Sequence, residues 1–145
     1  MKKTIGIRYA LRGLWEAIRY ERNMRIHITA AFYVIAYAWI GQVQRWALCA
    51  IFLCLGLVMA AELFNASIER MGDEVSKENR PLIGMAKDMG AGAVLIAAVF
   101  SVFSGALIFG QHEVMGQIAA SPRSWQILLA LPVFAAFVFA AGKKG

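Results

Sequence analysis

The sequence predicts an all-α integral membrane protein, and three observations support this prediction. The 145-residue chain is 60% hydrophobic and only 17% charged, whereas soluble domains are about 45–50% apolar and about 25% charged. Its apolar residues gather in runs long enough to cross much of a bilayer. The chain is also too short to hold a large soluble domain beside such segments, so any activity must be built at or in the membrane.

Charge and cysteine content exclude several other classes. The net charge of +6 comes mostly from residues beside apolar segments, where anionic lipid accounts for it better than a nucleic-acid partner does. Cys49 and Cys54 lie five positions apart in an apolar run without a CxxC spacing, so neither a disulfide nor a metal site is expected. A long basic lead precedes the first apolar run, so no cleavable signal peptide is expected.

The first predicted element is an amphipathic helix over residues 1–24 that lies in the membrane interface. Apolar residues recur at helical spacing, and arginines cluster on an adjacent arc; the apolar positions are Ile7, Leu11, Leu14 and Ile18, and the basic ones Arg8, Arg12 and Arg19. The first span is expected over residues 25–41. Its apolar part is only about 22 Å long, so the span must include one helical turn of the charged segment that precedes it. Glu21 then lies close to the headgroups.

The second predicted span covers residues 46–68. It follows a tight turn between Trp39 and Trp46, and such a pair is typical of the aromatic belt at a membrane face. Residues 69–90 carry many charges and contain Pro81, so we expect a helix end, a loop and the approach to the next helix.

The third predicted span covers residues 91–110, and small residues at its start allow close helix packing. Residues 111–123 are expected to form a polar outer loop. An additional, fourth transmembrane helix is expected over residues 125–141, with Pro132 inside it.

The distribution of charge predicts the topology. With the N-terminus in the cytoplasm, all fifteen lysines and arginines except Arg45 and Arg123 lie on the cytoplasmic side, as the positive-inside rule requires. Glu21, the helix face of Glu62, Asn65 and Glu69, and the pair Lys87-Asp88 are then expected to lie together at the cytoplasmic interface of the cell membrane.

Glu62, Asn65 and Glu69 close the apolar run of the second span. Their spacing of i, i+3 and i+7 places them on one helix face. An acidic residue at the centre of a membrane helix costs about 2.5–3.5 kcal/mol on insertion scales, so such a carboxylate indicates a functional site. The alternative interpretation is that the three residues are only the solvated end of a helix.

These side chains suit phosphoryl transfer. Carboxylate and amide oxygens are typical ligands of Mg²⁺, which is often held by one or two carboxylates and the phosphates of a substrate. Lys87 and the basic N-terminal arm supply cations that offset phosphate charge, and a remaining carboxylate can deprotonate a hydroxyl. No GxxxxGK[ST] or GxGxxG loop is present, so a nucleotide site here differs from both common kinase architectures.

The motif Glu62-Leu-Phe-Asn65-Ala-Ser-Ile-Glu69, followed by Asp73 and by Ala86-Lys87-Asp88 before a small-residue span, resembles the signature of the prokaryotic diacylglycerol kinase family. The resemblance covers about residues 9–110. Gly13-Leu-Trp-Glu-Ala17 with Glu21-Arg-Asn23 looks more like the undecaprenol kinase branch. Arg80 departs from the pattern, because many members carry His there.

The resemblance implies an ATP-dependent lipid kinase that works with Mg²⁺ and assembles as a homotrimer with shared active sites. Residues 1–111 would be the kinase domain, and residues 112–145 an outer loop and extra helix outside the family pattern. The implied substrate is undecaprenol, giving undecaprenyl phosphate. Diacylglycerol, giving phosphatidic acid, is the alternative lipid, and a non-enzymatic scaffold or transporter component is the alternative of another class.

The resemblance also implies roles for single residues. Glu62 matches the general base on the lipid hydroxyl, and Asn65 a neighbouring catalytic residue. Glu21 and Glu69 match magnesium ligands that also contact ATP. The remaining nucleotide-binding positions are Tyr9, Asp73, Lys87 and Asp88. The structural alternatives are an interface anchor for Tyr9, a helix N-cap for Asp88 and a snorkelling end residue for Lys87.

Overall fold

The computed structural model describes residues 4–75, 80–140 and 142, and within these ranges every regular element is an α-helix. The helices are α1 (Thr4–Tyr20), α2 (Arg22–Ile40), α3 (Arg45–Val75), α4 (Pro81–Phe109), α5 (His112–Ala120) and α6 (Pro122–Ala140). The prediction of an all-α membrane protein is confirmed.

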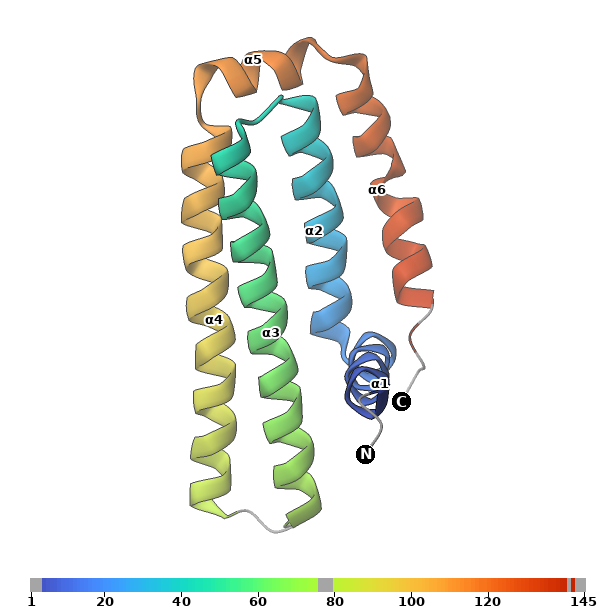
Figure 1. The fold of residues 1–145 in the computed structure, drawn as a ribbon, viewed down its shortest axis with the longest axis vertical. Coiled ribbons are helices and arrows are strands. Elements are labelled where there is room, and N and C mark those ends of the chain that lie inside the picture. The colour runs from blue at the N-terminus through green and yellow to red at the C-terminus, as the bar shows by residue number, and fades with distance from the viewer. Residues whose placement is uncertain (1–3, 76–79, 141, 143–145) are drawn as a thin grey trace.

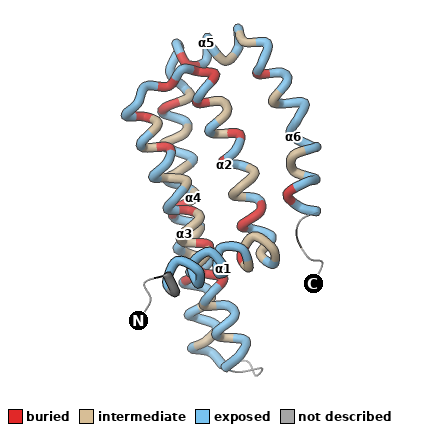
Figure 2. Tube along the Cα trace, turned by 45° about the vertical axis from the view of Figure 1, so that its right-hand side comes forward, coloured by how far each residue is buried: buried red, intermediate tan, exposed pale blue. Residues whose placement is uncertain are grey.

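The helices form one bundle with a transverse helix at each end (Figure 1). The long helices α2, α3, α4 and α6 run side by side, with α3 packed most extensively against α4 and α2 lying against both α3 and α6. α5 crosses one end of the bundle, and α1 crosses it where α2 begins and α6 finishes, while α3 and α4 continue beyond α1 (Figure 1 and Figure 2). The crossing direction of α1 agrees with the predicted interfacial helix.

Three helices, α3, α4 and α6, are long and apolar enough to cross a membrane. Their outward faces expose large apolar side chains, as lipid-facing surfaces do, and buried residues follow the lines of helix contact (Figure 2). α2 is not in this group, since its first two turns carry Arg22, Arg25 and His27. That residues 25–41 cross the membrane therefore stays a prediction, although α2 runs alongside α3 and α6.

The predicted end of the interfacial helix was wrong, whereas a helix end and the approach to the next helix lie within residues 69–90 as expected. The interfacial helix ends at Tyr20, before residue 24, because Glu21 adopts an extended backbone that turns the chain into α2. The helix of the second span continues to Val75, and that of the third begins at Pro81. Proline is well suited to the first turn of a helix, because the N–H that it lacks would have no partner there.

The prediction of an outer loop over residues 111–123 was also wrong, because this segment contains α5. Val114 and Ile118 lie one helical turn apart and pack on the bundle end. Val114 is buried, and a Cβ atom at Gly41 would lie 2.8 Å from its Cγ1 atom. The absence of a side chain at Gly41 thus allows α5 to close over the turn between α2 and α3.

Candidate active site

Glu62 and Asn65 face the interior of the bundle from α3. Only 2% of Glu62 and 5% of Asn65 is exposed. The Oε2 atom of Glu62 and the Oδ1 atom of Asn65 are buried without a hydrogen-bond partner among the described residues. A buried acceptor left unpaired costs about 1–3 kcal/mol. The interpretation that this face is only the solvated end of a helix therefore does not fit these two residues.

Glu69 lies one helical turn beyond Asn65 and is exposed. The Nδ2 atom of Asn65 donates a hydrogen bond of 2.9 Å to its Oε1 atom. This bond fixes the direction of the Asn65 amide, so that its Oδ1 atom points toward Gly90 of α4. A Cβ atom at Gly90 would lie only 2.7 Å from that oxygen.

The contact between α4 and Asn65 leads to a stability prediction. Gly90→Ala is expected to lower the free energy of unfolding by about 1–3 kcal/mol, because the new methyl group must displace the buried Asn65 amide from its position between the two helices. Gly92→Ala is the control, since a Cβ atom there meets nothing within 4 Å and alanine favours a helix. Thermal unfolding in detergent checks both, and equal midpoints for the two variants would contradict the prediction.

Glu21 reaches the same face from the corner between α1 and α2. Its Oε1 atom accepts hydrogen bonds from Arg70 of α3, at 3.2 Å from Nε and 2.8 Å from Nη2. Glu21, Glu69 and Asn23 all lie within interaction range of the Glu62 carboxylate. The structure thus brings together the three carboxylates that the sequence singled out.

The cluster suits a cation that completes its coordination with other oxygens. Within the described ranges, no three His, Cys, Asp or Glu side chains meet closely enough to hold a metal ion by themselves. Magnesium commonly takes one or two carboxylates, several waters and phosphate oxygens. Glu21 and Glu69 supply carboxylates, and the unpaired oxygens of Glu62 and Asn65 lie near them. These residues fit Mg²⁺ that arrives with a phosphate ligand.

Lys87 and Asp73 form an ion pair between α4 and α3. Gly72 allows the Lys87 side chain to lie against α3, since a Cβ atom there would be 2.7 Å from Cε of Lys87. Asp88 is exposed and lies inside α4, whose N-cap residue is Arg80. The alternative that Asp88 is a helix N-cap is therefore wrong.

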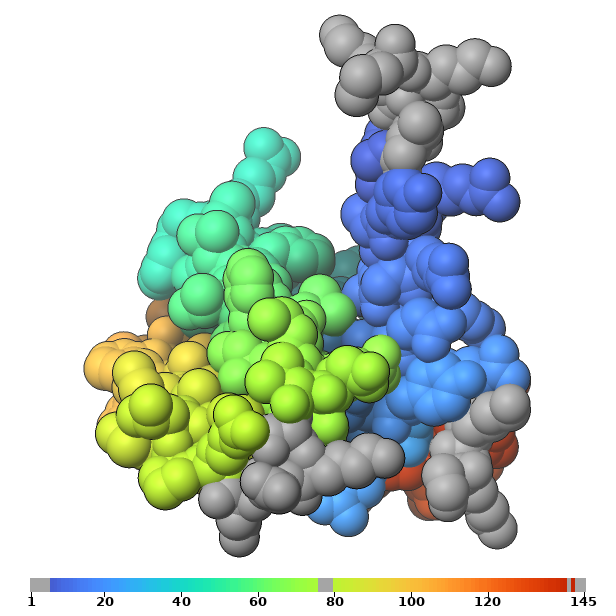
Figure 3. Space-filling view, turned by 90° about the horizontal axis from the view of Figure 1, so that it is seen from below, coloured from blue at the N-terminus to red at the C-terminus, as the bar shows by residue number. Residues whose placement is uncertain are grey.

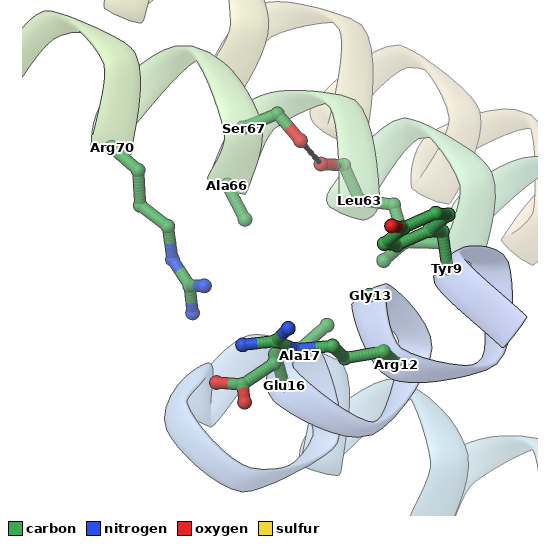
Figure 4. Close-up of a pocket in the computed structure, with 9 residues that line it drawn as sticks. All are labelled: Tyr9, Arg12, Gly13, Glu16, Ala17, Leu63, Ala66, Ser67 and Arg70. Carbon is green, nitrogen blue, oxygen red and sulfur yellow. Dashed lines mark hydrogen bonds between the residues drawn. The ribbon is translucent and has the colours of Figure 1, made fainter.

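A cavity of about 400 Å³ lies between α1 and α3 where the two helices cross, and Figure 3 shows them as neighbours in the view from below. Figure 4 shows Arg12 and Glu16 of α1 facing Arg70 and Ser67 of α3 across this cavity, with Tyr9 at one side. The two guanidinium groups can bind an anionic ligand, although the Glu16 carboxylate lines the same space and Arg70 is also paired with Glu21. Sequence reasoning identified Tyr9 and the basic N-terminal arm as a whole, but it did not single out Arg12 or Arg70.

A second, mainly apolar groove of about 350 Å³ runs between α2, α3 and α4. It includes Val58 and Met59, which lie one helical turn before Glu62 on α3, and it continues along α4 to Phe109. Sequence reasoning did not predict this groove. Its composition suits a hydrocarbon chain whose polar end lies near the carboxylate cluster.

Comparisons with known proteins agree on one family. The family model described as prokaryotic diacylglycerol kinase matches residues 8–109. Undecaprenol kinase of Bacillus subtilis (strain 168) is 39% identical over 101 residues, which is 70% of this chain and 82% of that protein. Diacylglycerol kinase of Synechocystis sp. is 36% identical over 102 residues, 70% of this chain and 58% of that protein. Diacylglycerol kinase of Escherichia coli (strain K12) is 41% identical over 56 residues, and this aligned segment is 39% of this chain and 46% of that protein.

Proposed function

Because the chain belongs to the prokaryotic diacylglycerol kinase family, we propose that it transfers the γ-phosphoryl group of ATP to a lipid alcohol. The observation that carries this proposal is the buried carboxylate of Glu62, whose Oε2 atom has no hydrogen-bond partner among the described residues. It lies one helical turn from an apolar groove, and within range of two further carboxylates. A lipid hydroxyl at the end of this groove would meet a base on one side and the phosphate-binding groups on the other.

Glu62 acts as the general base in this proposal. It accepts the proton of the lipid hydroxyl, whose oxygen forms a bond to the γ-phosphorus as the bond to the β-phosphate oxygen breaks and ADP leaves. Asn65 orients the reacting groups. Phosphoryl transfer depends mainly on positioning and on charge stabilisation, so a few polar groups at the membrane interface are sufficient.

The nucleotide lies on the side of the cluster that faces α1. Arg12 and Arg70 bind its phosphates in the cavity beside Tyr9, and Lys87, with Asp73 and Asp88 near it, supplies a further cation at the γ-phosphate. Glu21 and Glu69 would hold Mg²⁺, which would offset negative charge on the phosphates.

Undecaprenol is the proposed acceptor, ahead of diacylglycerol. The support is the relative named undecaprenol kinase, which is 39% identical over 82% of its own length. The test is a competition in which the purified protein, in vesicles containing equal amounts of both lipids, receives γ-labelled ATP. We expect most of the label in undecaprenyl phosphate. A preference for phosphatidic acid would overturn this assignment and leave the lipid kinase proposal intact.

A substitution at Glu69 tests the magnesium assignment. Glu69→Gln is expected to raise the Mg²⁺ concentration that gives half-maximal activity by about 10–100-fold, because the amide removes a negative ligand. The introduced amide would still offer an oxygen to Asn65, so the 2.9 Å hydrogen bond can be kept. Glu74→Gln is the control on an exposed position of α3. Identical magnesium titrations of the two variants would contradict the assignment.

The proposal includes a homotrimer with shared active sites, in the cell membrane with the cluster on the cytoplasmic side. The charge distribution of the chain supports this orientation. Chemical crosslinking in vesicles should give a ladder that ends at three protomers. A ladder that ends at two would contradict the trimer.

A further inference from the structure

Arg25 is a buried cation at the corner where α1 meets α2. Only 8% of the residue is exposed. Its Nη1 atom donates to the backbone carbonyls of Ile18, at 3.3 Å, and Arg19, at 3.0 Å. These carbonyls belong to the last turn of α1, where backbone acceptors have no partner within the helix and a positive charge is favourable. Arg25 therefore closes the C-terminal end of α1.

The C-terminal helix covers the other side of this arginine. The guanidinium lies over the ring of Phe139, 5.5 Å from its centroid. A Cβ atom at Gly142 would overlap the Arg25 guanidinium, so Gly142 lies directly against this group. Two further contacts fix α6 along α2. The rings of Phe134 and Phe32 stack with 4.2 Å between their centroids, and the Tyr37 hydroxyl donates a hydrogen bond of 3.3 Å to the Ser124 carbonyl.

The corner that Arg25 holds also carries part of the candidate site. Glu21 is the residue between α1 and α2, and its carboxylate is bound by Arg70. Tyr9 and Arg12 extend from α1 into the cavity shown in Figure 4. A change in the direction of α1 would therefore move both Glu21 and one wall of the cavity.

We propose that Arg25 is a positioning residue and that α6 holds it in place, so that the C-terminal extension sets the orientation of the α1 wall. α6 lies outside residues 8–109, which match the family model. This inference rests on the proposed kinase function for its kinetic test. The contacts of Arg25 with the end of α1 and with α6, which we call the clamp, are tested without any substrate.

The structural test is hydrogen exchange of the backbone amides around residues 18–25 in detergent. Phe139→Ala and Arg25→Gln should each speed exchange there by about three- to tenfold, because each removes part of the clamp. Phe139→Leu, which keeps apolar packing but removes the aromatic ring, should give a smaller change in the same direction. Phe137→Ala is the matched control on the same helix, since 73% of Phe137 is exposed, and Arg22→Gln is the exposed control for Arg25.

The kinetic test separates positioning from general damage. In Phe139→Ala and Arg25→Gln, the KM for ATP should rise about three- to tenfold, because Glu21 and the α1 wall both belong to the proposed nucleotide site. The change in kcat should stay below about twofold, since Glu62 on α3 and Lys87 on α4 are not displaced. Arg25→Lys should recover part of the ATP affinity, because it keeps a cation at the end of α1.

Two results would overturn the inference. One is exchange in Phe139→Ala that equals exchange in Phe137→Ala; the other is a fall in kcat with KM unchanged. If the wild-type protein phosphorylates no lipid, the proposed function fails, and the exchange experiment still decides whether the clamp exists.

Discussion

Glu62→Gln is expected to lower the rate of phosphoryl transfer to lipid by about 10²–10⁴-fold, the usual contribution of a general base. The amide has nearly the shape of the carboxylate but cannot accept a proton from the lipid hydroxyl. Since only 2% of Glu62 is exposed, an uncharged side chain should be well tolerated there, and the fold should be kept. Initial rates with labelled ATP in reconstituted vesicles measure this effect.

The control for this variant is Glu74→Gln, which changes an exposed carboxylate of the same helix. It should retain full activity, and both variants should show thermal unfolding close to that of the wild type. Near-wild-type phosphorylation by Glu62→Gln would contradict the catalytic assignment. It would instead favour a scaffold or transporter component in which the carboxylates serve helix packing or ion passage.

Lys87→Met is expected to lower kcat by about 10²–10³-fold. This is the usual effect of removing a preorganised group that stabilises charge in the transition state. Methionine keeps most of the apolar stem that lies against Gly72. The side chain of Asp73, which loses its partner, is 74% exposed, so water can solvate it, and the free energy of unfolding should change by less than about 1 kcal/mol.

Arg45→Gln is the control for Lys87→Met, because it removes a cation from the opposite end of α3. Its kinetic constants should match those of the wild type. Single-turnover rates at saturating ATP separate the loss of a transition-state contact from weaker nucleotide binding. If kcat falls less than about threefold in Lys87→Met, the proposed role of Lys87 at the γ-phosphate is contradicted.

The fold class could be predicted because it depends on composition and on patterns within single helices. The amphipathic pattern of α1 and the apolar runs of α3 and α4 each identify an element. α5 was missed because its only signal is the pair Val114 and Ile118 in a short polar stretch. The end of α3 and the start of α4 lie within residues 69–90, where the charged residues and Pro81 indicated a helix end and the approach to the next helix.

The candidate site likewise contains groups that local sequence spacing predicts and groups that only the fold brings together. Glu62, Asn65 and Glu69 could be grouped from helical spacing alone, and the bond between Asn65 and Glu69 spans a single turn. The pair between Glu21 and Arg70 joins positions 49 residues apart. It depends on the angle at which α1 crosses the bundle, and no local pattern encodes that angle.

The contacts of Arg25 were unpredictable for the same reason, because they join α1, α2 and the end of α6. The cavity between α1 and α3 likewise exists only once these helices are placed side by side. Local spacing thus identified the chemical groups, whereas the arrangement of α1 against the bundle determines which of them meet.

The central claim is that the face carrying Glu62 transfers a phosphoryl group from ATP to a lipid alcohol. The most direct measurement follows label from the γ-phosphate of ATP in a single turnover, using the purified protein in vesicles with magnesium and either undecaprenol or diacylglycerol. We predict that the label passes into the lipid phase with the wild type and stays in ATP with Glu62→Gln. Label that never enters either lipid with the wild type, or that enters equally with both proteins, would contradict the claim.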